Sequence, residues 1–156
     1  MRVGVLSDTH NSFEFAWRAI EEMSPVDMLL HAGDHYYDVF RIKLPENVPV
    51  VAVAGNSDYG DQGNAEEVVE LAGHRILLTH GHLYQVKFTC DKLLYRAGEL
   101  GVQAVVFGHT HMPVNTVEKG ILLFNPGSIS FPVGRSSPSF GILHIDKEIK
   151  GEIFYL

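Results

Sequence analysis

Five short apolar runs in this chain each end beside a carboxylate, amide or imidazole side chain. If these runs are strands of one α/β fold, their carboxyl ends share an edge, which is where ligands bind in open α/β sheets. Seven polar side chains from distant parts of the sequence would then meet there: Asp8, His10, Asp34, Asn56, His80, His109 and His111. The pattern therefore constrains the chain to a sheet-based fold with one polar cluster.

Hydrophobic periodicity predicts an α/β first half and a final third made of strands. Apolar runs predict strands at 3–6, 27–32, 48–54, 75–80 and 104–107. Helical spacing predicts one helix that begins just after His10, where Asn11 and Glu14 resemble a capping box, and another over 93–100. A meander of strands follows at 114–117, 121–124, 140–145 and 148–155, with a type II turn at 125–128. We expect a sandwich of sheets flanked by helices.

Length and composition predict one globular domain over residues 1–156, because 46% of the residues are hydrophobic and no low-complexity run interrupts them. The amino terminus lacks signal-peptide features and no apolar run could span a membrane, so we expect a cytoplasmic protein. The formal net charge of −7 argues against a broad nucleic-acid-binding surface, since such binding depends on Lys and Arg. The sequence leaves the oligomeric state open, including a homo-oligomer.

The polar cluster has the composition of a transition-metal site. Two carboxylates, four imidazoles and one amide suit Mn, Fe, Co, Ni or Zn better than Ca or Mg, which prefer oxygen ligands. Seven side chains exceed what one tetrahedral ion uses, so we expect two ions that share a ligand. In an extended chain His109 and His111 point to the same side and could serve two neighbouring ions.

An ordered series of motifs carries a family resemblance. Asp8-x-His10, Gly33-Asp34, Gly55-Asn56, His80 and Gly108-His109-x-His111 resemble the calcineurin-like metallophosphoesterase superfamily. The short length and the stretches SDTH, GNSD, THGH, FGHTH and NPGS are similar to its small single-domain, YfcE-like phosphodiesterase branch. The resemblance implies a four-layer α/β/β/α sandwich with a dimetal site at the carboxyl ends of the strands.

The resemblance also implies a role for each residue of the cluster. Asp8, His10 and His111 would bind the first ion, and Asn56, His80 and His109 the second. Asp34 would bridge both ions, and Asp34, Asn56 and His109 would form the catalytic centre. The implied reaction is attack of a bridging hydroxide on a small phosphodiester substrate. Two divalent ions per chain are implied, with manganese the first expectation and nickel, cobalt, iron or zinc as alternatives.

Two positions depart from the family pattern. Many relatives outside this branch have His after the Asn, as an acid for the leaving group, whereas this chain has Ser57. Small relatives often have Pro-Arg shortly after NPGS; here the first Arg is Arg135, so an arginine contact to phosphate is expected to be displaced or missing. The identity of the leaving-group acid therefore stays open.

The remaining histidines divide into two groups. His31, His35, His74 and His144 are interpreted as structural, because a histidine at a strand end is commonly half buried. His82 could support a ligand, line the substrate cleft or be structural.

A scaffold that keeps the fold and binds protein partners, with little or no hydrolysis, is the alternative function. A Rossmann dinucleotide site is disfavoured, because no G-x-G-x-x-G follows the first strand. The sequence does not identify the natural substrate or the physiological metal.

Overall fold

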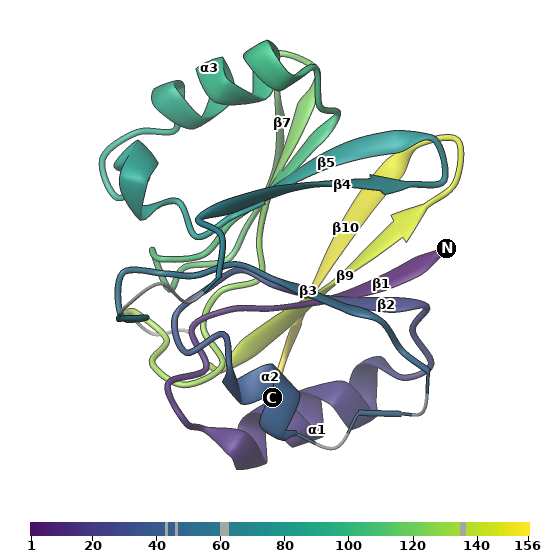
Figure 1. Cartoon of the computed structure of the whole chain (residues 1–156), viewed down its shortest axis with the longest axis vertical. Coiled ribbons are helices and arrows are strands. Elements are labelled where there is room, and N and C mark those ends of the chain that lie inside the picture. Colours follow the sequence, from purple (N-terminus) through teal and green to yellow (C-terminus); the bar gives the residue numbers. More distant parts are fainter. Residues whose placement is uncertain (43, 46, 60–62, 135–136) are drawn as a thin grey trace.

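Two five-stranded sheets form the centre of the molecule (Figure 1). The computed structural model describes residues 1–42, 44–45, 47–59, 63–134 and 137–156. The first sheet has the order β10-β9-β1-β2-β3, with β1 (Arg2–Leu6), β2 (Met28–His31), β3 (Val50–Ala52), β9 (Ser139–Ile145) and β10 (Ile149–Tyr155). The second has the order β4-β5-β6-β8-β7, with β4 (Glu66–Leu71), β5 (His74–Thr79), β6 (Ala104–Val106), β7 (Val114–Glu118) and β8 (Ile121–Asn125).

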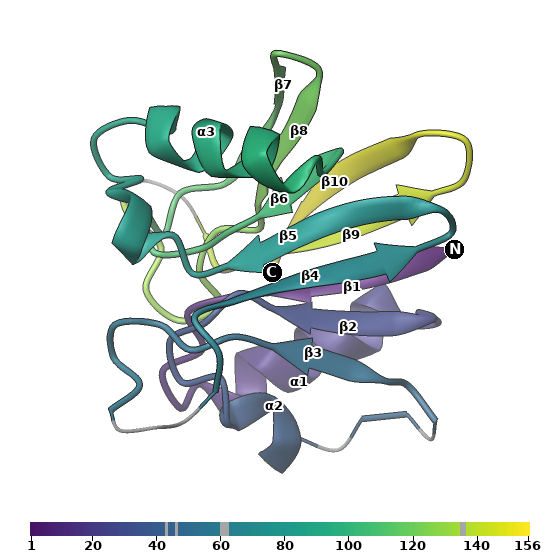
Figure 2. The same cartoon turned by 45° about the horizontal axis from the view of Figure 1, so that its top comes forward.

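Helices cover the outer face of each sheet, which gives four layers in the order α/β/β/α. In Figures 1 and 2, α1 (Phe13–Met23) and the short α2 (Asp38–Arg41) lie outside the first sheet, and α3 (Asp91–Leu100) lies outside the second. A 3₁₀ turn, η1 (His82–Tyr84), precedes α3. The four-layer architecture predicted from the sequence is confirmed.

Three apolar cores separate these layers, and each follows from the alternation of side chains along the strands. Val3 and Val5 of β1 meet Ile76 and Leu78 of β5 in the core between the sheets. Leu6 faces α1 instead, while Leu77 faces α3. Because both faces of the central strands are buried, these strands are almost continuously apolar in sequence.

The topology brings together the strand ends that carry the predicted polar side chains. In the first sheet β1, β2 and β3 pair in parallel, and in the second sheet β5, β6 and β8 do so. The loops that leave the carboxyl ends of these strands gather on one side of the molecule, at the left in Figure 1. Residues far apart in sequence therefore meet there.

Three details differ from the sequence prediction. The strands of the final third form two antiparallel hairpins in different sheets, β7–β8 and β9–β10, rather than one meander. Strand β4 was not predicted, because its sequence EEVVEL has no clear two-residue alternation. The first helix begins at Phe13 after Ser12, and no side-chain hydrogen bond caps it, so the capping box was wrong.

The segment just before α1 is instead tied to α2 and to the loop before α2. The Asn11 backbone N–H donates to Asp38 Oδ2 at 2.7 Å, and the Asn11 side-chain amide lies 3.1 Å from His35 Nδ1. No helix among the described residues is both long enough and apolar enough to cross a bilayer.

Candidate metal centre

Backbone and side-chain hydrogen bonds join the segments that follow the carboxyl ends of the strands in the two sheets. Within the first sheet, the Asp8 N–H donates to the Gly33 carbonyl at 3.0 Å. Across the sheets, the His109 N–H donates to Asp8 Oδ2 at 3.2 Å, and His80 Nδ1 donates to the Ala32 carbonyl at 2.8 Å. These contacts hold the loops of both sheets against one another.

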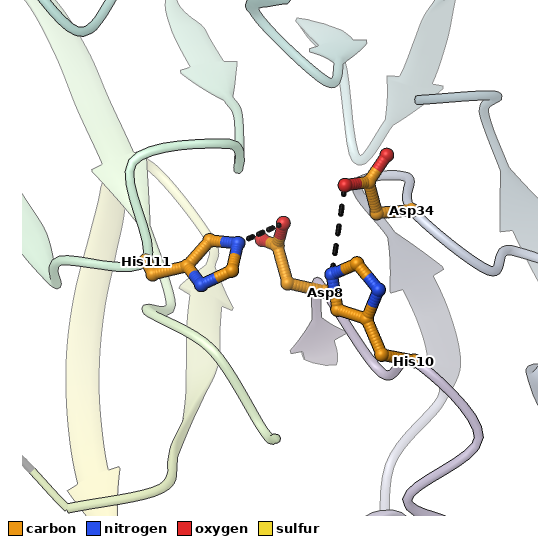
Figure 3. A group of neighbouring side chains, drawn as sticks. All are labelled: Asp8, His10, Asp34 and His111. Atoms are coloured by element: carbon orange, nitrogen blue, oxygen red, sulfur yellow. Dashed lines mark ion pairs between the residues drawn. The ribbon is translucent and has the colours of Figure 1, made fainter. Parts of the chain in front are cut away.

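Four of the seven predicted side chains form one compact group (Figure 3). One potential ligand atom from each of them lies within 4.8 Å of all the others, in Asp8, His10, Asp34 and His111. His111 Nε2 lies 3.0 Å from Asp8 Oδ1, and His10 Nε2 lies 3.6 Å from Asp34 Oδ2. The two carboxylates and two imidazoles thus converge from three separate loops.

The orientation of His111 is that of a metal ligand. Its Nδ1 lies 2.7 Å from the Phe131 carbonyl, which can only accept a hydrogen bond, so Nδ1 carries a proton. In the neutral ring Nε2 is then a bare lone pair, yet it faces a carboxylate oxygen of Asp8. Metal-bound histidines typically donate their other N–H to a carbonyl in this way, and a cation between Nε2 and Asp8 resolves the conflict.

His80 repeats the arrangement on the other side of Asp34. Because its Nδ1 donates to the Ala32 carbonyl, its Nε2 is the free ring nitrogen. That Nε2 lies 3.1 Å from Asn56 Oδ1 and 3.3 Å from Asp34 Oδ1, and His80 is fully buried. The Nε2 atom of His80 therefore faces two oxygens, and the three groups together offer ligands for a cation.

Two buried atoms of the compact group have no hydrogen-bond partner. They are Asp8 Oδ1 and His10 Nε2, and both belong to residues predicted to bind the first ion. Leaving such atoms unpaired in the interior costs roughly 1 to 3 kcal/mol each. The donor set and these unpaired atoms fit a divalent cation at this position.

Without a bound cation, Asp8 and His111 each shift the pKa of the other. Burial alone would raise the pKa of Asp8, but the contact with His111 and the charges of His80 and His111 hold it below its usual value. The same contact with Asp8 raises the pKa of His111 against the effect of burial. A proton on His111 Nε2 would occupy the place of a cation between the two side chains, so metal binding would release that proton.

His109 lies beside His80 rather than beside His111. The ring centroids of His109 and His80 are 5.0 Å apart, and burial lowers the pKa of His109 to about 4. Both His109 and His111 have positive φ values, of 66° and 57°, so the segment is not extended as predicted. Their rings nevertheless diverge to the two sides of the cluster, which fits two neighbouring cations.

Ser57 contacts Asp34 directly, which the sequence did not indicate. The Ser57 N–H donates to Asp34 Oδ1 and its hydroxyl donates to Asp34 Oδ2, both at 2.9 Å. The residue that departs from the family pattern therefore orients the carboxylate shared by the two halves of the cluster.

The four histidines interpreted as structural all have polar partners in the structure. His31 is buried, and both of its ring nitrogens have partners, in the Gly33 N–H and the Thr9 hydroxyl. His74 lies at the opposite end of β5, where its Nε2 contacts the Asp146 carbonyl at 2.9 Å. The His35 ring lies against that of His10, with centroids 4.9 Å apart and planes tilted by 53°, and His144 pairs with Glu152.

His82 belongs to the cluster rather than to the remote histidines. Its ring centroid lies 5.4 Å from that of His80 and 6.1 Å from that of His109, and its Nδ1 is buried without a hydrogen-bond partner. Burial lowers its pKa. Arg135, the displaced arginine, lies outside the described residues.

Comparisons with known proteins identify the family of the chain. Residues 1–148 match the family model of the calcineurin-like phosphoesterase superfamily domain. The chain belongs to this superfamily. It is 34% identical over 156 residues to the probable metallophosphoesterase YsnB of Bacillus subtilis, covering 99% of this chain and 90% of that protein.

Two further relatives extend the comparison. Phosphodiesterase YfcE of Escherichia coli K12 is 32% identical over 170 residues, covering 94% of this chain and 89% of YfcE. The crystal structure of a predicted phosphoesterase from Streptococcus pneumoniae superposes with a TM-score of 0.82 at 30% identity, covering 99% of this chain and 88% of that one. The family membership supports phosphoesterase activity and the use of divalent metals.

Proposed function

We propose that this protein is a metal-dependent phosphodiesterase with a dinuclear centre. Asp8, His10 and His111 hold one ion, Asn56, His80 and His109 hold the other, and Asp34 bridges them. The observation that carries the proposal is that His80 and His111 both donate from Nδ1 to a backbone carbonyl and direct Nε2 at a carboxylate oxygen, of Asp34 and Asp8 respectively. Manganese is the first candidate, with nickel, cobalt, iron and zinc as alternatives.

The protein's own groups prepare the site for phosphate chemistry. When bound, two divalent ions would supply a hydroxide nucleophile at neutral pH and positive charge for the phosphoryl oxygens. Asp34 is held from one side by Ser57 and faces His10 and His80 from the other. Asn56, which is exposed beside His80, can turn its amide toward a phosphate oxygen. The loops thus fix the donor atoms before substrate arrives.

A diester is proposed rather than a monoester on two grounds. YfcE is named a phosphodiesterase, and the chain resembles it over nearly its whole length. Ser57 stands where an imidazole could protonate a poor leaving group, and its hydroxyl is already engaged with Asp34.

The test starts from metal-free protein, to which Mn, Ni, Co, Zn or Mg is restored separately. Metal content is measured by elemental analysis, and activity is measured on aryl diesters, aryl monoesters, cyclic nucleotides and oligonucleotides. We expect close to two equivalents per chain and a preference for diesters. Saturation at one equivalent with full activity would contradict the dinuclear centre.

Asp34→Asn provides the matched mutational test. This variant should lose activity at least as severely as any variant of a single terminal ligand, because Asp34 alone faces both halves of the cluster. His74→Ala, at the far end of β5, should leave activity and metal content nearly unchanged. Normal turnover and two metals in Asp34→Asn would show that the bridging role is misassigned.

A scaffold function is the alternative. It predicts metal binding without turnover of any ester in the panel, and that result would replace the enzyme proposal.

A further inference from the structure

A cavity opens directly beside the proposed metal centre. Its volume is about 660 Å³, and His109 and His111 form part of its wall. The rest of the wall is mostly apolar and includes Val86, Met112 and Pro113. Pockets of roughly 300 to 1,000 Å³ with apolar walls and a few polar groups are typical of small-molecule sites.

Lys87 is the cationic side chain of this wall. Among the described residues it has no hydrogen bond or ion pair, although the chain carries 19 Asp and Glu residues. By contrast, Lys92 donates to Gln85 at 2.7 Å. Lys87 is exposed at the wall of the cavity, so its ammonium is available to an anionic ligand.

We propose that the cavity holds an aromatic leaving group of the diester and that Lys87 donates a hydrogen bond to the leaving oxygen. This inference rests on the proposed phosphodiesterase function. As hydroxide adds to phosphorus, the P–O bond to the leaving group breaks and its electron pair stays on that oxygen. The ammonium offsets the developing charge, and solvent water supplies the proton. Ring faces pack against the Met112 thioether and the Pro113 ring.

This assignment answers the question that Ser57 raises. The Ser57 hydroxyl is engaged with Asp34 on the side of the cluster near β2 and β3. The cavity lies against the loop after β6 and the segment after η1. Charge stabilisation of the leaving group thus comes from a different loop than in relatives with His after the Asn.

The kinetic test compares Lys87→Met with Lys87→Arg, and uses Lys92→Met as a surface control. Substrates are methyl aryl phosphodiesters of graded leaving-group acidity. In Lys87→Met we expect kcat/KM to fall by about 10²-fold for the least acidic phenols and much less for the most acidic. Lys87→Arg should retain most activity, and Lys92→Met all of it. Every variant should keep the wild-type metal content. An equal loss across all leaving groups, or no loss, would overturn the role of Lys87.

A binding measurement tests the cavity independently of turnover. Calorimetry on metal-loaded protein compares methyl benzylphosphonate, in which CH₂ replaces the leaving oxygen, with methyl ethylphosphonate. We expect the benzyl compound to bind about tenfold more tightly, since an aromatic ring buries more apolar area. Met112→Ala should reduce this preference.

Two outcomes separate this inference from the proposed function. Diester hydrolysis with equal affinities for the two phosphonates would overturn the cavity assignment and leave the proposed function standing. A benzyl preference without hydrolysis of any diester would sustain the aromatic site and overturn the proposed function.

Discussion

Backbone conformation at single residues sets the geometry of the cluster. Asp8, His10, Asp34, His109 and His111 all have positive φ values, between 42° and 66°, although none of them is glycine. Such conformations cost free energy and persist only where surrounding contacts fix them, often at functional sites. The hydrogen bond from the His109 N–H to Asp8 Oδ2 is one of these contacts.

The orienting role of Ser57 leads to a first prediction. Ser57→Ala removes the hydroxyl donor to Asp34 Oδ2 but keeps the backbone donor to Oδ1. Because such supporting contacts typically contribute 10- to 100-fold to metal affinity, we expect a loss of about that size. Competitive titration against a fluorescent chelator measures it. Ser57→Thr keeps the hydroxyl and should bind metal nearly as the wild type does; equal affinity in all three proteins would refute the role.

Burial of His31 gives a second prediction, for metal-free protein. Burial lowers the pKa of His31 from 6.5 to about 4, because the charged ring would lose its hydration, and the Gly33 N–H donates to its Nδ1. As the pH falls below 6.5, the unfolded chain takes up this proton before the folded one does. Stability should therefore decline from pH 6.5 toward 4, by at most about 1.4 kcal/mol per pH unit from this group.

His31→Asn tests this prediction, since the Asn Oδ1 can still accept from Gly33 without titrating. Urea unfolding across this pH window should show a shallower decline than in the wild type. His144→Asn, at an exposed position, serves as the surface control. An identical slope in His31→Asn and the wild type would mean that other groups cause the decline.

At the scale of elements, most strands were predictable from the sequence because the central strands are buried on both faces and are therefore almost continuously apolar. The apolar run that became β5 shows this, since Leu77 faces α3 while Ile76 and Leu78 face the other sheet. Strand β4 escaped prediction because it lies at a sheet edge and its residues are mostly half buried. The start of α1 was misplaced because Asn11 bonds to Asp38 of α2, which is distant in sequence.

The sequence indicated which residues belong to the candidate site better than it indicated how they are arranged. The identities of the clustered residues followed from their places after apolar runs. The contact between Ser57 and Asp34, and the membership of His82, depend on how β3 and η1 pack against neighbours. Local patterns carry no information on such packing.

Close packing between loop elements gives a third prediction. A Cβ added at Gly108, after β6, would lie 2.0 Å from Ser7 Oγ and 2.9 Å from Asp8 Oδ2. Gly108→Ala should therefore displace Asp8, weaken metal binding and destabilise the protein by about 1 to 3 kcal/mol. Gly98→Ala, in α3 with nothing within 4 Å of the added Cβ, should instead stabilise by up to about 1 kcal/mol. Thermal melts and metal titrations would distinguish the two, and unimpaired metal binding in Gly108→Ala would contradict this view of the loop.

At the scale of the whole molecule, the cluster lies across the junction of the two sheets. Asp8, His10 and Asp34 follow strands of the first sheet, while His80, His109 and His111 follow strands of the second. The apolar core joins the sheets along their length, but at this end buried carboxylates and imidazoles face one another. Cations at the junction would hold the two sheets together where the apolar core ends.

The final prediction is that metal binding stabilises the entire fold. A ligand that binds only the folded state at 100 times its Kd adds about 2.7 kcal/mol per site. For a domain of this size each kcal/mol raises Tm by roughly 2 to 4 °C, so one ion should raise it by about 5 to 10 °C. Calorimetric melts of chelated and metal-restored protein measure the shift. Asp34→Asn should lose most of the shift and His74→Ala should keep it. Since the ions join groups from both sheets, the melt should remain a single transition; a metal-independent Tm would show that the cluster does not hold the sheets together through a cation.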